Sequence, residues 1–249
     1  MSANATSRIR GVNDFVIKFA NVNGSGSASA NEMFAKSFLR MGVPVSPRNI
    51  FPSNIQGLPT WYEVRVTEQG YLGRRGGVDM MVAMNPQTWD KDVLEIEPGG
   101  YLLYDSTKPL AAGRVRPDVH LIGVPLTEMC NAAYQDPRER QLLKNIMYVG
   151  ALAAMLDIDT DVIPQLLGEQ YKGKQKLMAP NLDAYGKGYD YAKTHLAGAC
   201  DLSVRRASNV GDKIFIDGNA AAALGCVYGG ASVCAWYPIT PSSSVAEAF

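Results

Sequence analysis

The chain has 249 residues, 47% of them hydrophobic, and its 24 Lys and Arg residues balance its 24 Asp and Glu residues. This length and hydrophobic share support a sizeable buried core and exclude a disordered protein. The zero formal net charge favours neither nucleic acid nor a membrane surface as a partner. The apolar stretch at residues 15–20 is too short for a signal sequence or a membrane span, so we expect a cytoplasmic protein.

The first half of the sequence predicts alternating strands and helices. Residues 14–20 are β-rich, residues 23–27 (NGSGS) break the chain, and apolar residues then recur at helical spacing up to Gly42. Residues 60–67 alternate in polarity, which predicts a strand with one wetter face near a sheet edge. Nearly continuous apolar runs, typical of strands covered on both faces, follow at residues 78–84, 100–104 and 119–124. These elements predict an α/β sandwich.

Two apolar stripes at helical spacing predict two helices in the second half of the chain. They comprise Leu142, Ile146, Val149, Ala153 and Leu156, and then Leu182, Tyr185, Tyr189, Ala192 and Leu196. We expect both helices to pack onto the sheet. The sequence becomes polar at residues 205–212 and rich in small residues after Asp217. This change predicts one domain at residues 1–210 and the beginning of another at 211–249.

The cysteines and histidines show no spacing typical of a metal site. Cys130, Cys200, Cys226 and Cys234 form no C-x-x-C pair, and His120 and His195 lie far apart in the sequence. We interpret the cysteines as ordinary thiols in a reducing compartment and expect no metal ligand in this chain.

The turn at residues 23–30 (NGSGSASA) is a candidate anion site. Small residues between a strand and a helix let backbone N–H groups approach a phosphate, and the helix N-terminus favours negative charge. The turn is not a G-x-G-x-x-G fingerprint, because Ala28 or Ser29 replaces the third glycine. The alternative is an ordinary turn in which Ser25 or Ser27 caps the helix.

The most specific pattern lies near the end of the chain. Residues 218–225 read GNAAAALG, and residues 237–244 read YPITPSSS. Pro238 and Pro241 restrict the backbone around Thr240, and the serines are placed to cap a helix starting near Val245. The two segments resemble the G-N-x-A…A-L-G…Y-P-I-T-P-S-S signature that begins the pyrimidine domain of 2-oxoacid:ferredoxin oxidoreductases.

The resemblance extends upstream over nearly the whole chain. Residues 52–60 (PSNIQGLPT) match the P-S-x-I-x-G-x-P loop of the gamma domain that is fused to some alpha subunits of this family. Residues 145–154 and 188–192 resemble its N-M-x-x-L-G-A-L and G-Y-x-Y-A elements. The resemblance implies an α/β fold: a gamma-type, mostly parallel sheet flanked by helices, then the start of a thiamine-enzyme pyrimidine domain.

The sequence departs from the family pattern in two motifs. The loop usually carries R-G-G but here reads Gln56-Gly57-Leu58, and the usual G-N-E-A reads G-N-A-A at residues 218–221. A second R-G-G, within residues 73–77, precedes a buried strand and is interpreted as a solvated loop. Substrate preference is therefore less transferable than the reaction class.

By resemblance, the chain is part of an enzyme subunit of carbon metabolism that oxidatively decarboxylates a 2-oxoacid, with coenzyme A as cosubstrate and ferredoxin as electron acceptor. The fused gamma–alpha order favours 2-oxoglutarate over pyruvate. Thiamine diphosphate, Mg²⁺ and a 4Fe-4S cluster would lie on a partner beta subunit. The chain alone would then be incomplete for catalysis, and we expect it to continue past Phe249.

The resemblance also implies roles for individual residues. Thr240 would be the catalytic residue that binds the substrate carboxylate or the nearby carbonyl. The other expected site residues are Ser53, Ile55 and Gly57 at the substrate pocket, and Gly24, Ser25, Gly26 and Ser27 at the coenzyme A phosphates. Two other functions stay open, a non-catalytic coenzyme A or nucleotide-binding module and an assembly subunit.

Overall fold

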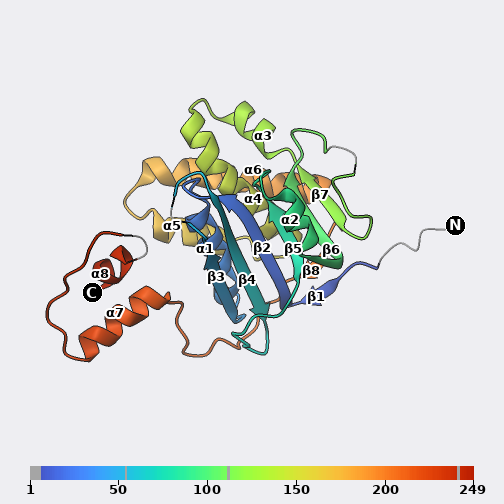
Figure 1. The fold of residues 1–249 in the computed structure, drawn as a ribbon. Coiled ribbons are helices and arrows are strands. Elements are labelled where there is room, and N and C mark those ends of the chain that lie inside the picture. Colours follow the sequence, from blue (N-terminus) through green and yellow to red (C-terminus); the bar gives the residue numbers. More distant parts are fainter. Residues whose placement is uncertain (1–6, 54, 111–112, 240–241) are drawn as a thin grey trace. The chain divides into compact units, whose positions relative to one another are not determined.

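The computed structural model describes residues 7–53, 55–110, 113–239 and 242–249 (Figure 1). The chain divides into two compact units, Met1–Gly211 and Asp212–Phe249. The first unit contains every described strand and the helices α1 to α6, and the second contains α7 and α8.

A six-stranded sheet organises the first unit. Its strands lie in the order β3 (Val45–Ile50), β4 (Pro59–Thr67), β2 (Asp14–Val22), β5 (Val78–Ala83), β6 (Ile96–Asp105) and β7 (His120–Val124). Only β4 runs against the others among these strands, which confirms the predicted mostly parallel α/β fold. Two short strands, β1 (Arg10–Val12) and β8 (Asp201–Ser203), pair in parallel beside it.

The sequence patterns missed one strand, which lies outside the strand that was predicted near a sheet edge. Strand β3 contains Pro47 and carries no clear alternation, yet it pairs with β4 along its whole length. Therefore β4 lies one place inside the sheet, and β3 forms the edge. A proline is tolerated at such an edge because the outer side of an edge strand needs no ladder hydrogen bond.

Aromatic side chains pack one face of the sheet against α1 (Ser27–Arg40) and α4 (Pro137–Met155). Ring centroids lie 5.4 Å apart for Phe19 and Phe34, 4.9 Å for Phe34 and Phe38, and 5.8 Å for Phe19 and Tyr148. These rings are fully buried. We call this the aromatic face; in Figure 1 its helices lie behind the sheet.

The helix predicted from the second apolar stripe, α6 (Gln175–His195), packs mainly on α4 rather than on the sheet. Two glycines allow this close approach. A Cβ atom on Gly150 would lie 2.2 Å from the carbonyl oxygen of Tyr185, and one on Gly188 would lie 1.9 Å from that of Met147. Helix α5 (Val162–Gln170) contacts both α1 and α6. The prediction that both helices pack directly on the sheet is therefore wrong for α6.

The opposite face of the sheet carries buried charged side chains and packs against the short helix α2 (Trp89–Leu94). Lys18, Glu63, Arg65 and Asp79 are each no more than 8% exposed. We call this the charged face. The alternation in β4 had predicted a face in contact with water. Instead these charged groups are buried, and Lys18, Glu63 and Asp79 each form an ion pair.

The loop at residues 73–77 covers part of the charged face. As predicted it is solvent-exposed, but two of its side chains reach inward. Arg74 donates from Nε and Nη2 to the two carboxylate oxygens of Glu63, at 2.7 and 2.9 Å, and Arg75 pairs with Asp79. Exposed arginines thereby anchor this loop to buried carboxylates.

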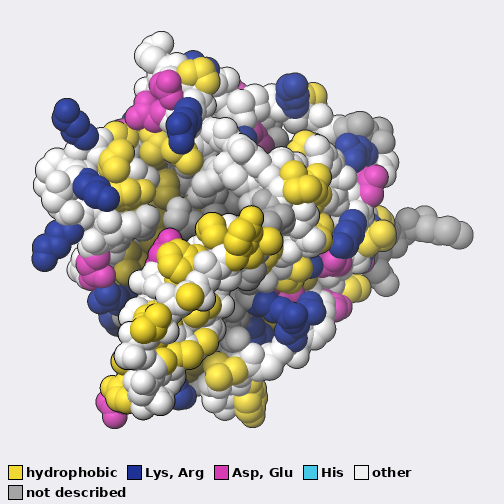
Figure 2. All heavy atoms as spheres, turned by 60° about the vertical axis from the view of Figure 1, so that its left-hand side comes forward, with side chains coloured by type: hydrophobic (Ala, Val, Ile, Leu, Met, Phe, Trp, Pro, Cys, Tyr) yellow, Lys and Arg dark blue, Asp and Glu magenta, His cyan; other side chains and the backbone are white. Residues whose placement is uncertain are grey.

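The second unit consists of α7 (Gly218–Tyr228), α8 (Ser243–Ala248) and the segment between them. The Asp217 carboxylate caps α7 by accepting a hydrogen bond from the N–H of Ala220 at 2.9 Å. The serines were predicted to cap α8, but no side chain caps it; Ser242 Oγ instead donates to the carbonyls of Tyr237 and Ile239. Several hydrophobic side chains of this unit are exposed: Ile214, Leu224, Val227, Tyr228, Val233, Trp236, Tyr237 and Ile239. Figure 2 shows hydrophobic side chains gathered at the surface of the protein.

Candidate functional site

Two segments with predicted binding roles lie against each other where β2 ends. Asn23 joins them: its N–H donates to the Leu58 carbonyl at 2.8 Å, and its own carbonyl accepts from the Gly57 N–H at 2.9 Å. The Asn23 side chain also donates to the Ile55 carbonyl at 3.1 Å. The predicted phosphate turn and the predicted substrate loop are therefore neighbours. Sequence reasoning assigned no role to Asn23, although an asparagine directly before a glycine turn is a common signal for such bonding.

The turn itself requires glycine at two positions. Gly24 and Gly26 have φ values of 82° and 80°, which side chains rarely adopt. A Cβ atom on Gly26 would also lie 2.4 Å from Cδ2 of Leu142. Gly26 is the N-cap of α1 and no side chain caps the helix, so the alternative of a serine cap is wrong. Ser25 Oγ instead donates to Ser27 Oγ at 3.1 Å.

The backbone of this turn offers hydrogen-bond donors. Among the described residues, the N–H groups of Gly24, Gly26 and Ser27 donate to no protein acceptor. They lie at the N-terminus of the 14-residue helix α1, where the aligned peptide dipoles favour negative charge. Donors of this kind in a turn with positive φ form a concave site that suits a phosphate or a carboxylate.

The predicted substrate loop, within residues 52–60, presents apolar side chains to solvent, among them Ile55 and Leu58. Ser53 is half-buried, and its Oγ accepts from the N–H of Ile55 at 3.2 Å. Ile55 is 61% exposed. Gly57 has a φ of 90°, and a Cβ atom at this position would have no atom beyond the adjacent residues within 4 Å. Ser53 therefore shapes the loop, whereas Ile55 is available for contact.

A buried polar chain fixes the turn to the helices of the aromatic face. Asn145 of α4 is 4% exposed and donates to the Ser25 carbonyl at 2.9 Å. One turn further along α4, the Tyr148 hydroxyl donates to Asn31 Oδ1 at 2.7 Å, and Asn31 Nδ2 donates to Asn21 Oδ1 at 3.1 Å. Burial raises the pKa of Tyr148, so its hydroxyl stays protonated. The Asn145 bond therefore holds the turn to α4, and the chain from Tyr148 through Asn31 to Asn21 joins α4, α1 and β2.

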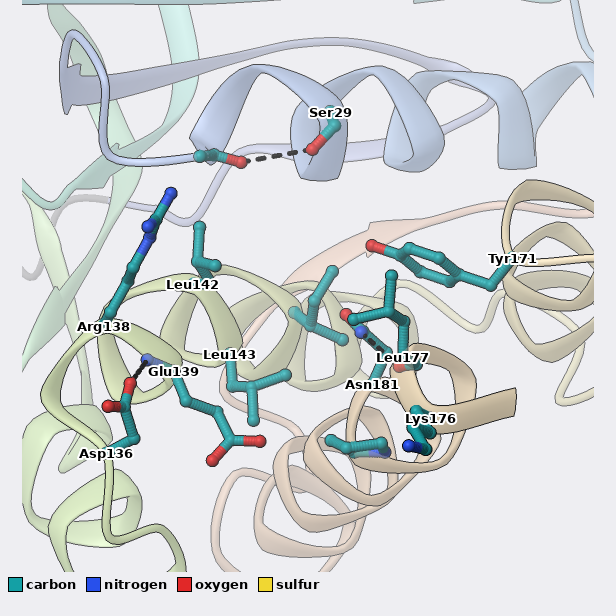
Figure 3. Close-up of a pocket in the computed structure, with 13 residues that line it drawn as sticks. Ser29, Asp136, Arg138, Glu139, Leu142, Leu143, Tyr171, Lys176, Leu177 and Asn181 are labelled. Atoms are coloured by element: carbon teal, nitrogen blue, oxygen red, sulfur yellow. Dashed lines mark hydrogen bonds between the residues drawn. The ribbon is translucent and has the colours of Figure 1, made fainter. Parts of the chain in front are cut away.

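An open cavity of about 530 Å³ adjoins the turn (Figure 3). The N-terminal parts of α1, α4 and α6 line it, together with Tyr171, the C-cap residue of α5. The sequence did not predict this cavity, because its walls come from four segments that are distant along the chain. Its lining residues are Gly26, Ser29, Asp136, Arg138, Glu139, Leu142, Leu143, Ile146, Tyr171, Lys176, Leu177, Pro180 and Asn181.

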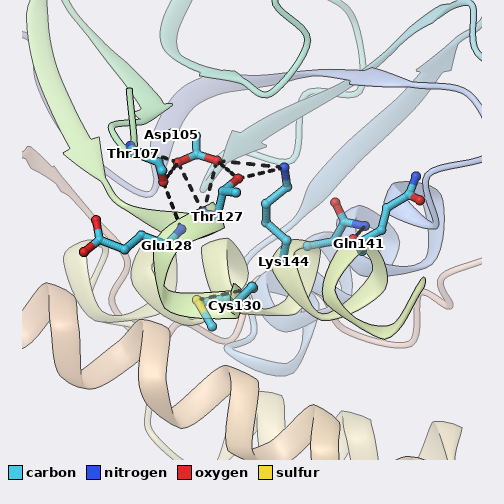
Figure 4. A network of polar contacts seen from close by, with 9 residues as sticks. Asp105, Thr107, Thr127, Glu128, Cys130, Gln141 and Lys144 are labelled. Atoms are coloured by element: carbon cyan, nitrogen blue, oxygen red, sulfur yellow. Dashed lines mark hydrogen bonds and ion pairs between the residues drawn. The ribbon is translucent and has the colours of Figure 1, made fainter. Parts of the chain in front are cut away.

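A second polar network lies at the end of β6, where α3 (Leu126–Ala133) begins (Figure 4). The Asp105 carboxylate accepts from the hydroxyl and N–H groups of both Thr107 and Thr127, and Lys144 Nζ lies 3.8 Å away. Burial opposes ionisation of Asp105, but these hydrogen bonds outweigh it and lower the pKa of the carboxyl. All the donors are internal, so the network positions α3 rather than forming a ligand site.

The remaining sequence candidates give no metal centre in the part of the chain that the structure describes. Its His, Cys, Asp and Glu side chains form no group of three or more that could hold a metal ion. Burial raises the pKa of Cys130 to about 11 and that of Cys200 to about 12, so both thiols are protonated at neutral pH. Thr240, the predicted catalytic residue, lies outside the described residues, as does Asn54 of the substrate loop. None of the described helices is long and apolar enough to span a membrane.

The sequence matches the family described as pyruvate ferredoxin/flavodoxin oxidoreductase over residues 16–191, a segment that contains the turn, the loop and the cavity. The chain belongs to this family. Members similar to it are subunit alpha of 2-oxoacid:ferredoxin oxidoreductase 2 from Aeropyrum pernix and the 2-oxoglutarate oxidoreductase subunit KorA from Mycobacterium tuberculosis, each 24% identical. These matches cover 94% and 92% of this chain but only 42% and 40% of the relatives. The chain thus spans about two fifths of their length.

Solved structures in this family have the same fold. The 2-oxoglutarate:ferredoxin oxidoreductase from Magnetococcus marinus is 26% identical, with a TM-score of 0.81 over 95% of this chain and 41% of its own. That structure contains bound 2-oxoglutarate, coenzyme A and succinyl-CoA. The gamma subunit of a keto/oxoacid ferredoxin oxidoreductase from Geobacter sulfurreducens is 19% identical, with a TM-score of 0.56 over 72% of this chain and 99% of its own. The family resemblance and the gamma-type α/β fold predicted from the sequence are confirmed.

Proposed function

We propose that the chain is part of the alpha subunit of an enzyme that oxidatively decarboxylates a 2-oxoacid, forms an acyl-coenzyme A and passes electrons to ferredoxin. The observation that carries this proposal is the pairing of the turn and the substrate loop through Asn23. The turn offers unpaired N–H groups for an anionic ligand, and the loop offers an apolar wall beside it. Two similar relatives named as alpha and KorA subunits support the same reaction class.

We assign 2-oxoglutarate as the substrate and coenzyme A as the ligand of the turn. Support comes from the KorA relative, which is named for 2-oxoglutarate, and from the Magnetococcus marinus enzyme, whose structure holds 2-oxoglutarate and coenzyme A. In this chain the backbone of residues 24–27 would bind coenzyme A phosphates. Ser53, Ile55 and Gly57 would form the wall against the oxoacid, and Thr240 would donate a hydrogen bond to its carboxylate or carbonyl.

The remaining chemistry belongs to partners in this proposal. Thiamine diphosphate with Mg²⁺ would supply the carbanion chemistry from a beta subunit, and a 4Fe-4S cluster there would carry electrons to ferredoxin. Residues 1–210 act as the gamma-type domain and residues 211–249 begin the pyrimidine domain. The reaction takes place in the cytoplasm. This chain's own residues bind and orient the oxoacid and coenzyme A.

Substitution of Thr240 tests the proposal. A hydrogen bond from a neutral donor to a carboxylate is worth about 1.5–3 kcal/mol, so Thr240→Ala in the assembled enzyme should lower kcat/KM for 2-oxoglutarate roughly 10- to 150-fold. Thr240→Ser keeps the hydroxyl and should retain most activity. Both variants must assemble and hold thiamine diphosphate as the wild type does. Wild-type kinetics in Thr240→Ala would remove Thr240 from the substrate site.

The unpaired N–H groups of the turn by themselves would also fit a non-catalytic module that binds coenzyme A or a nucleotide. Reduction of ferredoxin, dependent on both a 2-oxoacid and coenzyme A, separates the two functions. If the native assembly binds coenzyme A but never reduces ferredoxin with any 2-oxoacid, the module is the correct description.

A further inference from the structure

Asn145 fixes the orientation of one peptide group in the glycine turn. Its side chain is 4% exposed, and its Nδ2 donates to the Ser25 carbonyl at 2.9 Å. In a planar trans peptide the C=O and N–H bonds point in opposite directions. The N–H of the same peptide belongs to Gly26, so it points away from Asn145, and it donates to no described acceptor. The bond from Asn145 thereby keeps this N–H available to an anion at the N-terminus of α1.

The local sequence does not hold this peptide by itself. Ser25 lies between Gly24 and Gly26, whose φ values are 82° and 80°. Glycine accepts both signs of φ, so the peptide between Ser25 and Gly26 is free to flip by rotation of the two bonds beside it. Among the described residues, Asn145 is the one group that donates to the Ser25 carbonyl. After a flip this carbonyl oxygen would lie where the N–H now points, and it would repel an anion.

Two further contacts set the position of the Asn145 amide. Its Nδ2 also donates to the Gln141 carbonyl at 3.3 Å, so the NH2 group faces two carbonyl oxygens, those of Ser25 and Gln141. One helical turn along α4, the Tyr148 hydroxyl donates to Asn31 of α1 at 2.7 Å. This bond keeps α4 in register with the helix that the turn begins. The donor is therefore positioned by both helices before any ligand binds.

We propose that Asn145 is a positioning residue of the anion site, which holds the peptide between Ser25 and Gly26 with its N–H available to the ligand and its carbonyl turned away. This inference rests on the proposed function, in which the turn binds coenzyme A phosphates. Asn145 acts through the turn and not by contact with the ligand. The motif at residues 145–154 thus begins with a side chain that serves a turn 120 positions earlier in the chain.

Steady-state kinetics of the assembled enzyme test this role. Asn145→Ala removes the donor, and we expect the KM for coenzyme A to rise about 10-fold, with kcat and the KM for 2-oxoglutarate within about twofold of the wild type. Asn13→Ala is the matched control at the opposite end of β2. Asn13 is 2% exposed, and its Nδ2 donates to the Arg205 carbonyl at 2.9 Å. This control should lower the melting temperature without changing either KM.

Asn145→Asp provides a second test, because it keeps the shape of the side chain and makes donation depend on pH. An ionised carboxylate only accepts hydrogen bonds, so it would repel the two carbonyl oxygens and favour the flipped peptide. A protonated carboxyl donates, and burial favours that form. The ratio of variant to wild-type KM for coenzyme A should therefore fall about 5-fold or more from about pH 8 to about pH 6. The ratio for Asn145→Ala should stay constant.

The outcomes separate this inference from the proposed function. A wild-type KM for coenzyme A in Asn145→Ala overturns the inference, as does an equal rise in the KM values of both substrates. If Asn145→Ala does not assemble, the pH series of Asn145→Asp decides, since both measurements use the same folded protein. A ratio that does not change with pH then overturns the inference. Turnover of the wild type that is independent of coenzyme A contradicts the proposed function instead.

Discussion

The two faces of the six-stranded sheet are covered by different kinds of interaction. On the aromatic face, Phe19 and its neighbours contact α1 and α4 through fully buried rings. On the charged face, buried Lys18, Glu63 and Asp79 are satisfied by Glu95, Arg74 and Arg75. Both faces exclude water, the aromatic face through apolar contact and the charged face through ion pairs beside an apolar cluster that includes Trp61, Met81 and Trp89.

This difference separates what each face does for the protein. Burial of apolar rings stabilises the fold in proportion to the area removed from water. On the aromatic face this burial fixes the helices that hold the turn and line the cavity. A buried ion pair adds little net stability, because desolvation offsets the attraction, but loss of one partner is costly. The aromatic face should therefore dominate the free energy of unfolding, and the charged face should determine where the loop at residues 73–77 lies.

Phe19→Ala should have the largest effect. Phe19 is fully buried and contacts both Phe34 of α1 and Tyr148 of α4, so its truncation leaves a cavity between the sheet and two helices. We expect a loss of about 3–5 kcal/mol in the free energy of unfolding, measured with urea. Phe51→Ala is the control, because Phe51 is 36% exposed and should change stability by well under 1 kcal/mol. Equal losses in the two variants would contradict the dominant role of the aromatic face.

Arg74→Ala should have the next largest effect. It leaves the Glu63 carboxylate, only 5% exposed, without its bidentate partner, which should cost about 1–3 kcal/mol. Arg114→Ala is the matched control, since Arg114 pairs with Asp90, whose side chain is 82% exposed, and such surface pairs contribute about 0–1 kcal/mol. Proteolysis at residues 73–77 should also become faster in Arg74→Ala alone. A loop that stays protected would show that Arg74 does not anchor it.

The aromatic face could be read from the sequence, whereas the charged face could not. Rings at helical spacing and continuous apolar runs predict burial directly. Glu63 and Arg65 alternate with valines, a pattern that is typical of a solvated face, and only tertiary pairing reveals that both are buried. Strand β3 was missed because Pro47 argues against a strand, and this objection does not hold at a sheet edge.

The candidate site was predictable in its parts but not in its assembly. The glycine turn and the predicted substrate loop are local motifs, so the sequence could single out residues 24–27 and 53–57 as candidates, and their binding roles stay predictions. Their contact through Asn23 and the support from Asn145 join segments about 30 and 120 positions apart, and periodicity carries no information on such pairs. The cavity has the same origin, because Arg138, Tyr171 and Asn181 show no common local motif.

Asp105→Asn should have a moderate, pH-dependent effect, because the ionised carboxylate at the end of β6 accepts hydrogen bonds from Thr107 and Thr127. Hydrogen bonds from Thr107 and Thr127 outweigh burial and lower its pKa. A pKa lower in the folded than in the unfolded chain adds stability above the unfolded value, near 4, and this stability is lost as the pH falls through the folded value. Asp105→Asn should thus cost about 1–2 kcal/mol at pH 7 and progressively less below about pH 4, measured by urea unfolding. A cost independent of pH would contradict the role of ionised Asp105.

Asp92→Asn should have the smallest effect and the opposite pH dependence. Asp92 belongs to the charged face and is fully buried. Burial raises the pKa of Asp92, and the nearby charge of Glu95 raises it further. The hydrogen bonds from Thr88 and Trp61 and the charge of Lys18 lower this pKa but do not outweigh burial. A folded pKa above the unfolded value means that the folded chain holds the proton more tightly, so stability falls as the pH rises through the window between the two values.

An asparagine at position 92 carries no charge, so the cost of burying the ionised Asp92 carboxylate disappears. Its Oδ1 can still accept from Trp61 Nε1, which donates to the Asp92 carboxylate at 2.8 Å, and its Nδ2 can donate to the Thr88 hydroxyl oxygen. We therefore expect Asp92→Asn to match or exceed wild-type stability at pH 7, by less than about 1 kcal/mol, and to lose this advantage below about pH 4. Asp92→Ala leaves the Trp61 N–H unpaired and should be destabilising at every pH, by about 1–3 kcal/mol. If Asp92→Asn is as unstable as Asp92→Ala at pH 7, the ionised carboxylate is a net stabiliser of the folded protein. The favourable interactions of this buried charge would then exceed the free-energy cost of removing it from water.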